Sequence, residues 1–213
     1  MKSLLAAALP VLAGVSFGPG FTSEHALRLA GRLWLAWLLL WLALAFFSKS
    51  TKRRESRGER LQHVLPIALA CLLLFGDRIG AWLAWRMFPE NATLLAACLA
   101  VTAAGLVFSF WPRLALGSNW SGEVTIKAGH ELVRKGPYRR IRHPIYTGLL
   151  AAFLATAVLQ GRLSGLLAFL LVAAAIYGKA RREERFLEQE FGEGFAEHRR
   201  HTGMFLPRLL PRA

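Results

Sequence analysis

Residues 136–148 read GPYRRIRHPIYTG and run directly into the apolar stretch LLAAFLATAVL. Arg142 and His143 therefore lie where a polar segment meets the start of an apolar helix. Pro144 suits the first turn of that helix, because its missing N–H would have no partner there anyway. The free N–H groups of a helix start attract anions, and Arg142 adds a planar guanidinium that binds carboxylate or phosphate. The stretch therefore predicts an anion-binding group at the mouth of an apolar helix.

The apolar stretch is the first arm of a predicted helical hairpin. The runs 145–159 and 163–178 are separated by only three residues, which is the length of a tight connection between antiparallel helices. Such a hairpin places the start of its first helix beside the end of its second. The polar residues at the two bases are therefore expected to meet: Arg142, His143 and Tyr146 from one helix, and Arg182, Glu183 and Glu184 from the other.

The two glutamates would face the anion-binding group across this hairpin. Glu183 and Glu184 can hold an ammonium group or the hydroxyl groups of a ribose. A ligand with a carboxylate, an ammonium group and a sugar would use the whole set, and S-adenosylmethionine is such a ligand. The spacing alone fits two plainer interpretations equally well. The basic residues would then anchor a helix at the membrane surface, and the glutamates would be ordinary surface charge.

The composition is that of a membrane protein. The chain has 213 residues, of which 54% are hydrophobic, with a formal net charge of +14 and a mean hydropathy of +0.37. High hydropathy together with high charge indicates basic loops between membrane spans. Nucleic-acid binding needs a basic face on a soluble fold, and too little polar sequence remains to build one. We therefore expect membrane lipid as a partner and no nucleic acid.

Six apolar runs predict an all-α, polytopic transmembrane helix bundle of about six spans. A helix needs about 20 apolar residues to cross the hydrocarbon core. The first run is short and follows a basic N-terminus, so a cleaved signal peptide is the alternative to a retained span. The runs are 4–17, 26–47, 64–85, 93–111, 145–159 and 163–178.

The distribution of basic residues predicts the orientation. With a cytoplasmic N-terminus, most of the 27 Lys and Arg residues fall in cytoplasmic segments, as the positive-inside rule requires. Both termini are then cytoplasmic, and the chain divides into N-terminal spans over 1–111 and a site-bearing region over 112–213. We expect an integral protein of a bacterial inner membrane. The basic residues outside this pattern are Arg28, Arg32, Arg78, Arg86 and Arg162.

Three sets of residues inside the apolar runs are expected to be structural. A tryptophan stripe at helical spacing is typical of lipid-facing or interfacial anchors. An acid–base pair within a span can face the bundle interior or reach the membrane surface. Isolated cysteines in apolar runs fit neither a disulfide framework nor a metal site, so no metal is expected. These sets are Trp34, Trp37 and Trp41, then Asp77 and Arg78, then Cys71 and Cys98.

The C-terminal half resembles the superfamily of isoprenylcysteine carboxyl methyltransferases and phospholipid methyltransferases. The resemblance covers roughly residues 113–207. It rests on two long motifs in the right order, separated by the predicted hairpin: GHELVRKGPYRRIRHPIYTG, residues 129–148, and EERFLEQEFGEGFAEHRRHTGMFLP, residues 183–207. The N-terminal spans resemble the family only in being hydrophobic.

This resemblance implies an integral membrane enzyme that uses S-adenosylmethionine in a cytosolic pocket without a Rossmann domain. It implies that Arg142 orients the accepting group, that Glu184 has a catalytic role and that Glu183 contacts the cofactor. The acceptor would be a lipophilic small molecule or lipid that offers a carboxylate or an amine. The further cofactor contacts implied are His130, Leu132, Gly136, Tyr138, His143, Pro144 and Tyr146.

Two alternatives and one departure accompany this interpretation. Membrane sterol reductases, which use NADPH, share the Arg-His-Pro region, but they usually carry Asn where this chain has Ile145 and they lack the paired glutamates. A non-catalytic protein whose basic loops bind anionic lipid is the second alternative. The departure lies in the tail, where family members often have Tyr and this chain has Phe195 and His198, which puts a contact between tail and substrate in doubt.

Overall fold

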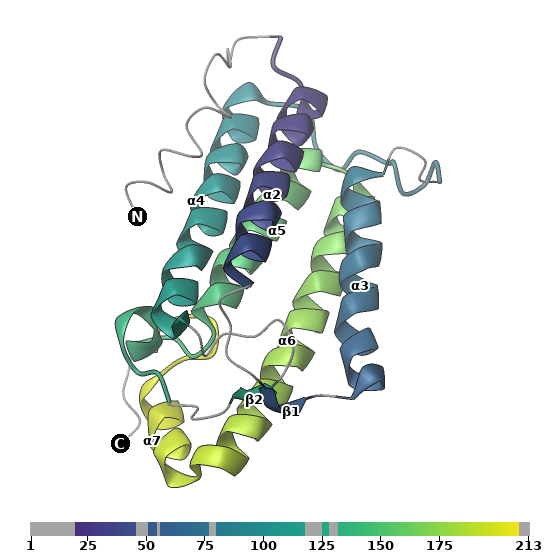
Figure 1. Cartoon of the computed structure of the whole chain (residues 1–213). Coiled ribbons are helices and arrows are strands. Elements are labelled where there is room, and N and C mark those ends of the chain that lie inside the picture. Colours follow the sequence, from purple (N-terminus) through teal and green to yellow (C-terminus); the bar gives the residue numbers. More distant parts are fainter. Residues whose placement is uncertain are drawn as a thin grey trace.

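The computed structural model describes residues 20–45, 51–54, 56–76, 80–117, 125–127 and 132–208. It shows a bundle of helices that run roughly along one direction (Figure 1), so the predicted all-α class is confirmed. A short antiparallel pair of strands, β1 (Thr51–Arg54) and β2 (Thr125–Lys127), lies at one end. The helices are α2 (Ser23–Ala45), α3 (Arg57–Phe75), α4 (Ala92–Leu116), the 3₁₀ helix η2 (Gly136–Arg139), α5 (Pro144–Gln160), α6 (Leu163–Phe191) and α7 (Glu193–His201).

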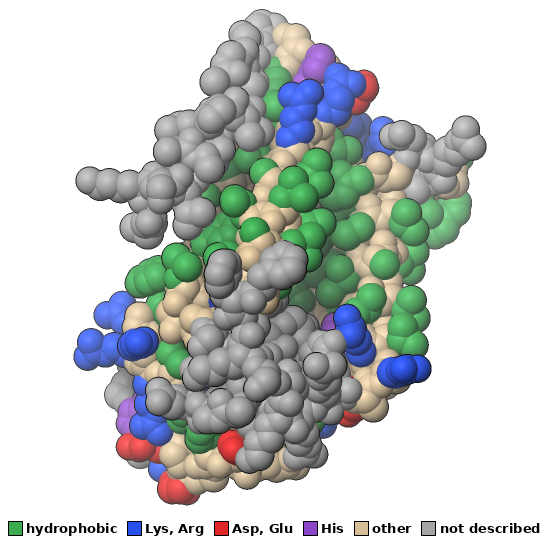
Figure 2. Space-filling model, in the orientation of Figure 1, with side chains coloured by type: hydrophobic (Ala, Val, Ile, Leu, Met, Phe, Trp, Pro, Cys, Tyr) green, Lys and Arg blue, Asp and Glu red, His purple; other side chains and the backbone are tan. Residues whose placement is uncertain are grey.

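Four of these helices, α2, α3, α4 and α6, are long and apolar enough to cross a membrane. Helix α5 is also apolar but shorter, with 17 residues. Leucines on α2 and α3 point outward, as lipid-facing residues do, and apolar side chains cover the middle of the face in Figure 2. Five of the six predicted runs therefore correspond to helices. The first run, 4–17, lies outside the described residues.

The bounds of the third predicted span, 64–85, were wrong at both ends. Helix α3 begins earlier because Ser56 and Glu59 form a capping box: the Ser56 hydroxyl accepts from Glu59 N, and the Glu59 carboxylate accepts from Ser56 N. It ends at Phe75, since Gly76 leaves the helical conformation. Trp82 and Trp85 consequently lie beyond the helix and are exposed. Asp77 and Arg78 lie outside the described residues.

Helices α4 and α5 make their closest approach at two glycines. A Cβ atom built on Gly105 would lie 2.6 Å from the carbonyl oxygen of Gly148, and one built on Gly148 would lie 2.6 Å from that of Gly105. Small residues let two backbones approach within a membrane, where packing rather than water exclusion drives association. This contact fixes α5, and with it the polar residues at its N-terminus, against α4.

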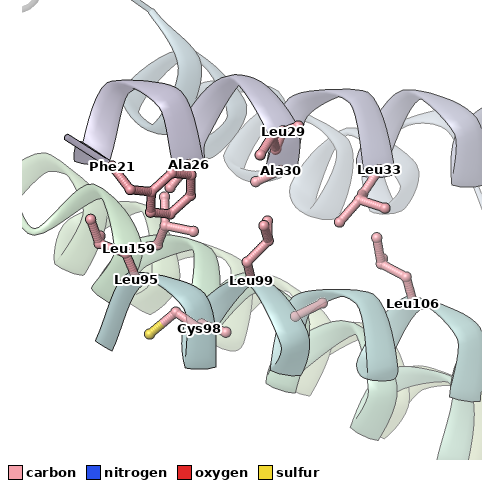
Figure 3. Close-up of a cluster of buried hydrophobic side chains, with 12 residues drawn as sticks. Phe21, Ala26, Leu29, Ala30, Leu33, Leu95, Cys98, Leu99, Leu106 and Leu159 are labelled. Carbon is pink, nitrogen blue, oxygen red and sulfur yellow. The ribbon is translucent and has the colours of Figure 1, made fainter. Parts of the chain in front are cut away.

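Helix α2 packs on α4 and α5 through both apolar and polar contacts. Figure 3 shows Phe21, just before α2, and α2 residues Ala26 to Leu33 facing leucines of α4 and α5. Further along, Trp34 Nε1 donates to Thr156 Oγ1 at 3.1 Å and Trp37 Nε1 donates to Ser109 Oγ at 2.8 Å. Trp41 is buried and stacks on Trp37. The tryptophan stripe therefore faces the bundle rather than lipid, because its indole N–H groups find hydroxyl partners on α4 and α5.

The predicted tight hairpin joins α5 to α6. Gly161 adopts φ 68°, a left-handed conformation that favours glycine, and its N–H donates to Ala157 O. Beside it, Gln160 Nε2 donates to the last carbonyl oxygens of α3, at Leu73 and Leu74. Polar contacts therefore join α3 and α5 at this end of the bundle. From here α5 and α6 lie side by side toward the opposite end.

Candidate functional site

The bases of α5 and α6 meet at His143, as the hairpin predicted. His143 is the N-cap residue of α5 and Pro144 occupies the first turn. The imidazole lies between the two glutamates of α6, with Nδ1 3.4 Å from Glu183 Oε2 and Nε2 3.3 Å from Glu184 Oε1. A neutral imidazole carries a single N–H donor, whereas the imidazolium carries two. A ring held between two carboxylates therefore favours its charged form.

The electrostatic balance at His143 agrees with this geometry. Burial by itself would lower the pKa of His143, because the charged ring loses its hydration. The hydrogen bonds and negative charges of Glu183 and Glu184 outweigh burial and raise that pKa above its ordinary value. The site therefore favours the charged form of a histidine at the mouth of an apolar helix.

Arg142 forms a short ion pair with Glu184. Its Nε donates to Glu184 Oε1 at 2.6 Å, and the side chains are only 11% and 4% exposed. Its Nη1 donates to the carbonyl oxygen of Thr202. The sequence predicted a planar guanidinium that would bind the carboxylate or phosphate of a ligand. In the structure, Arg142 instead binds the glutamate on α6 and a carbonyl group of the tail.

Glu183 and Glu184 differ sharply in accessibility. The Glu184 side chain is enclosed between Arg142 and His143, whereas the Glu183 side chain retains 24% exposure. Glu183 Oε1 accepts from the Tyr146 hydroxyl at 2.5 Å. Of the two carboxylates, Glu183 is therefore the one that can reach a ligand, while Glu184 is enclosed by the protein.

Tyr146 provides a flat surface beside Glu183. Its ring stacks on that of His143, with centroids 5.6 Å apart and an interplanar angle of 12°. Lys179, one helical turn before Glu183, places its Nζ 5.9 Å from the Tyr146 centroid. A half-buried aromatic ring next to a carboxylate suits a ligand that combines a planar base with hydroxyl or cationic groups.

A segment of the tail, residues 202–205, crosses the site, and we call it the C-terminal strap. The N–H groups of Arg142 and His143 donate to Gly203 O and Met204 O, at 2.9 and 3.0 Å. Thr147 Oγ1 donates to Phe205 O at 2.6 Å. Sequence reasoning missed the strap because its contacts use backbone atoms. The only signal was its place within the second family motif.

The remaining predicted residues lie around this cluster. Gly136 begins η2 with φ 60° and rests against the end of α4, and Tyr138 is buried beside it. Leu132 is half-buried. Within the described part of the chain, these three residues make no hydrogen bond to Glu183 or Glu184. His130 lies outside the described residues.

Arg182 is the one residue of the predicted meeting point that turns away from it. Its guanidinium contacts α3 instead, with Nη1 2.9 Å from Gln62 Oε1 and Nη2 3.2 Å from His63 Nδ1. Sequence reasoning missed both α3 residues. The available signal was a Gln-His pair at the polar start of an apolar run.

The site residues offer some of the groups that an amino-acid nucleoside such as S-adenosylmethionine would use. Glu183 offers a partly exposed carboxylate for hydroxyl or cationic groups, and the half-buried ring of Tyr146, which stacks on His143, offers a planar surface. Arg142 was expected to bind the carboxylate of such a ligand, but in the structure it is paired with Glu184. The carboxylate of such a ligand would therefore need another partner.

Comparison with known proteins supports the family resemblance. Residues 92–194 match the family model described as phospholipid methyltransferase. That range contains α4, the hairpin and both glutamates, so the resemblance proposed from the two motifs is confirmed. Together with the apolar helices, the match supports a membrane methyltransferase in general terms.

Three curated proteins are similar over part of the chain. An uncharacterized protein of Bacillus subtilis, YpbQ, is 28% identical over 119 residues, covering 55% of this chain and 70% of that protein. The cobalt-zinc-cadmium resistance protein CzcN of Cupriavidus metallidurans is 37% identical over 84 residues, covering 39% and 38%. Methanethiol S-methyltransferase 2 of Bradyrhizobium diazoefficiens is 40% identical over 79 residues, covering 35% and 28%. The chain thus spans less than half of the latter two.

Proposed function

We propose, from the match of residues 92–194 to the phospholipid methyltransferase family, that this protein is an integral membrane methyltransferase. It would transfer a methyl group from S-adenosylmethionine to a lipophilic acceptor that carries a carboxylate or an amine. The observation that carries the proposal is the cluster of Glu183, His143 and Glu184 at the base of the hairpin. The methanethiol S-methyltransferase similarity points the same way.

Each residue of the cluster has a distinct part in the proposal. Glu183, with Tyr146, would bind cationic or hydroxyl groups of the cofactor. Glu184 would hold Arg142 and His143 in place, and Arg142 would orient the acceptor. His130, Leu132, Gly136, Tyr138 and Pro144 remain proposed cofactor contacts. When bound, S-adenosylmethionine would supply a methyl group activated by its sulfonium.

The location of the cluster suits reactants from two phases. His143 and Tyr146 lie at the N-terminus of α5, where the polar segment before the helix meets its apolar residues. A cofactor would reach this level from the aqueous side and a lipophilic acceptor from the membrane. Holding both in line at the methyl carbon would be the main catalytic contribution of the protein. A carboxylate acceptor needs no general base, whereas an amine must first lose a proton.

The remaining parts of the proposal concern location. We place the protein in a bacterial inner membrane with both termini in the cytoplasm, on the strength of its basic loops. The cluster would then face the cytoplasm. A reporter fused to the C-terminus should be active only in its cytoplasmic form, and activity only outside the cytoplasm would reject this orientation.

Ligand titration tests the function directly. Purified protein in detergent should bind S-adenosylhomocysteine in calorimetry and show no heat with NADPH. Folded protein that binds NADPH alone would support a reductase, and folded protein that binds neither would reject the enzyme proposal. Incubating membranes with radiolabelled S-adenosylmethionine should then label an extractable lipid or amphiphile, whose chemistry identifies the acceptor.

A further inference from the structure

Three consecutive residues of α6 hold three different parts of the chain. Arg182 contacts α3, Glu183 contacts Tyr146 on α5, and Glu184 contacts Arg142. Successive side chains of an α-helix point about 100° apart. Contacts in three such directions fix the rotation of α6 about its own axis, and this rotation decides where Glu183 points.

The contact with α3 depends on two uncharged acceptors. An arginine side chain has donors only, so Nδ1 of His63 is the acceptor in its contact with Arg182. Gln62 Oε1 accepts from the other terminal nitrogen. His63 and Arg182 are 4% and 9% exposed, and Arg182 Nε has no hydrogen-bond partner within the described residues. The buried guanidinium therefore relies on Gln62 and His63.

Helix α3 supplies this contact from outside the family match. The match covers residues 92–194, whereas α3 spans Arg57–Phe75. In Figure 1, α3 lies along α6 and away from α4, so α6 is its main support. The polar start of α3 thus meets α6 at the residue that directly precedes Glu183.

We propose that Gln62 and His63 are positioning residues, which hold Arg182 and thereby keep α6 in the rotation that aims Glu183 at Tyr146 and His143. Without these acceptors, Arg182 would be a buried cation without a partner. Its least costly relief is to swing toward water. That movement turns α6 and draws Glu183 away from the site. The catalytic meaning of this inference rests on the proposed function, but its geometric claim does not.

Two substitutions of His63 separate positioning from simple packing. His63→Phe keeps a ring of similar size but removes the acceptor. His63→Asn is smaller, yet places an oxygen near the position of Nδ1. If packing matters, His63→Phe is the milder change. If the acceptor matters, His63→Asn is the milder change, and rescue by Asn is the expected result.

The pKa of His143 reports the position of Glu183 without any ligand. We would measure it by NMR titration of protein labelled in histidine. His63→Phe should lower this pKa by about half a unit or more, because a nearby carboxylate moves away. His63→Asn should leave it near the wild-type value. An unchanged pKa in folded His63→Phe protein would overturn the proposal.

Affinity for S-adenosylhomocysteine provides the second readout. His63→Phe should weaken binding about tenfold or more, which is the scale of one charge-assisted hydrogen bond. In a Glu183→Gln background, His63→Phe should cause no further loss of affinity, because the substitution acts through Glu183. Equal losses in both backgrounds would contradict the inference.

The outcomes distinguish this inference from the proposed function. If wild-type protein binds no S-adenosylhomocysteine, the proposed function fails while the His143 titration still decides whether α3 positions Glu183. If His63→Phe does not fold, Gln62→Leu replaces it. Gln62 is exposed, and its substitution by leucine removes one of the two acceptors of Arg182. A smaller shift of the same sign is then expected, and no shift would reject the proposal.

Discussion

Arg142 and Glu184 form a 2.6 Å ion pair that is almost fully enclosed, although 41 residues separate them in the chain. A charge pair removed from water is strongly destabilised when one partner is lost, because the other charge stays buried. The pair therefore couples the segment before α5 to α6. It leaves Glu183, the preceding residue, as the more exposed of the two carboxylates.

Neutralising Glu183 should affect cofactor affinity, whereas neutralising Glu184 should affect stability. Glu183→Gln should weaken S-adenosylhomocysteine binding about 10- to 150-fold, the value of a hydrogen bond to a charged group, with little loss of stability. Glu184→Gln should instead lower the free energy of unfolding by about 3 kcal/mol or more, because Arg142 loses its partner. Calorimetry and thermal unfolding in detergent measure the two effects. Loss of affinity alone in Glu184→Gln would contradict the division of roles.

Arg142→Lys keeps the charge but removes the fork that reaches both Glu184 and the strap. We expect turnover to fall about 100-fold or more through misplaced reactants, with cofactor affinity nearly unchanged. Arg139→Lys is the matched control, because Arg139 is exposed in the same segment. The measurements are initial rates at saturating cofactor and calorimetric affinity. If Arg142→Lys loses affinity while keeping its maximal rate, Arg142 holds the cofactor rather than the acceptor.

Gly148→Ala should destabilise the bundle where α4 and α5 cross. The added Cβ would lie 2.6 Å from the carbonyl oxygen of Gly105, so the helices must separate. Overpacking of this kind costs about 1–3 kcal/mol. Gly58→Ala is the control, because Gly58 is an exposed residue of α3 and a Cβ built on it meets nothing within 4 Å. Thermal unfolding of both variants should show a lower midpoint for Gly148→Ala only.

Two histidines should shape the pH dependence of stability in opposite ways. Burial, followed by the charges of Arg134 and Arg142, lowers the pKa of His198 to about 4. Its unfolded value is near 6.5, so its contribution is complete above pH 6.5 and is lost as the pH falls toward 4. The pKa of His143 is raised, so the stability it provides is present below pH 6.5 and is lost as the pH rises through the raised value.

His198→Tyr should therefore flatten the acid side of the stability curve. The decrease in the free energy of unfolding assigned to His198 is at most about 1.4 kcal/mol per pH unit between pH 6.5 and 4. Tyrosine does not titrate in this range. Unfolding by denaturant at several pH values measures the slope. An equally steep acid slope in His198→Tyr would assign the effect to other groups.

Much of the bundle could be predicted from sequence, because apolar runs and the three-residue hairpin leave few arrangements. The meeting of His143 with Glu183 and Glu184 followed from the hairpin alone. The bounds of α3 were missed because a capping box outweighed the hydrophobic pattern. The inward-facing tryptophans were missed because periodicity does not reveal the hydroxyl partners Thr156 and Ser109.

The site itself was only partly predictable. A sequence shows which charges come close but not how they pair, so the ion pair of Arg142 with Glu184 was not predicted. Arg182 was expected at the cluster, yet its side chain points to α3, since neighbouring residues of one helix face different directions. Contacts made through backbone atoms, such as those of the strap, leave no pattern of residue types.

The C-terminal strap has a consequence for how the protein is made. The helices can enter the membrane one after another as the chain emerges, but the N–H groups of Arg142 and His143 find their acceptors only at Gly203 and Met204. The site is therefore completed only after the ribosome has passed Phe205. A chain truncated within α7 would keep the membrane-spanning helices but lack the carbonyl groups of Gly203 and Met204, so termination late in translation would yield the spans without a complete site.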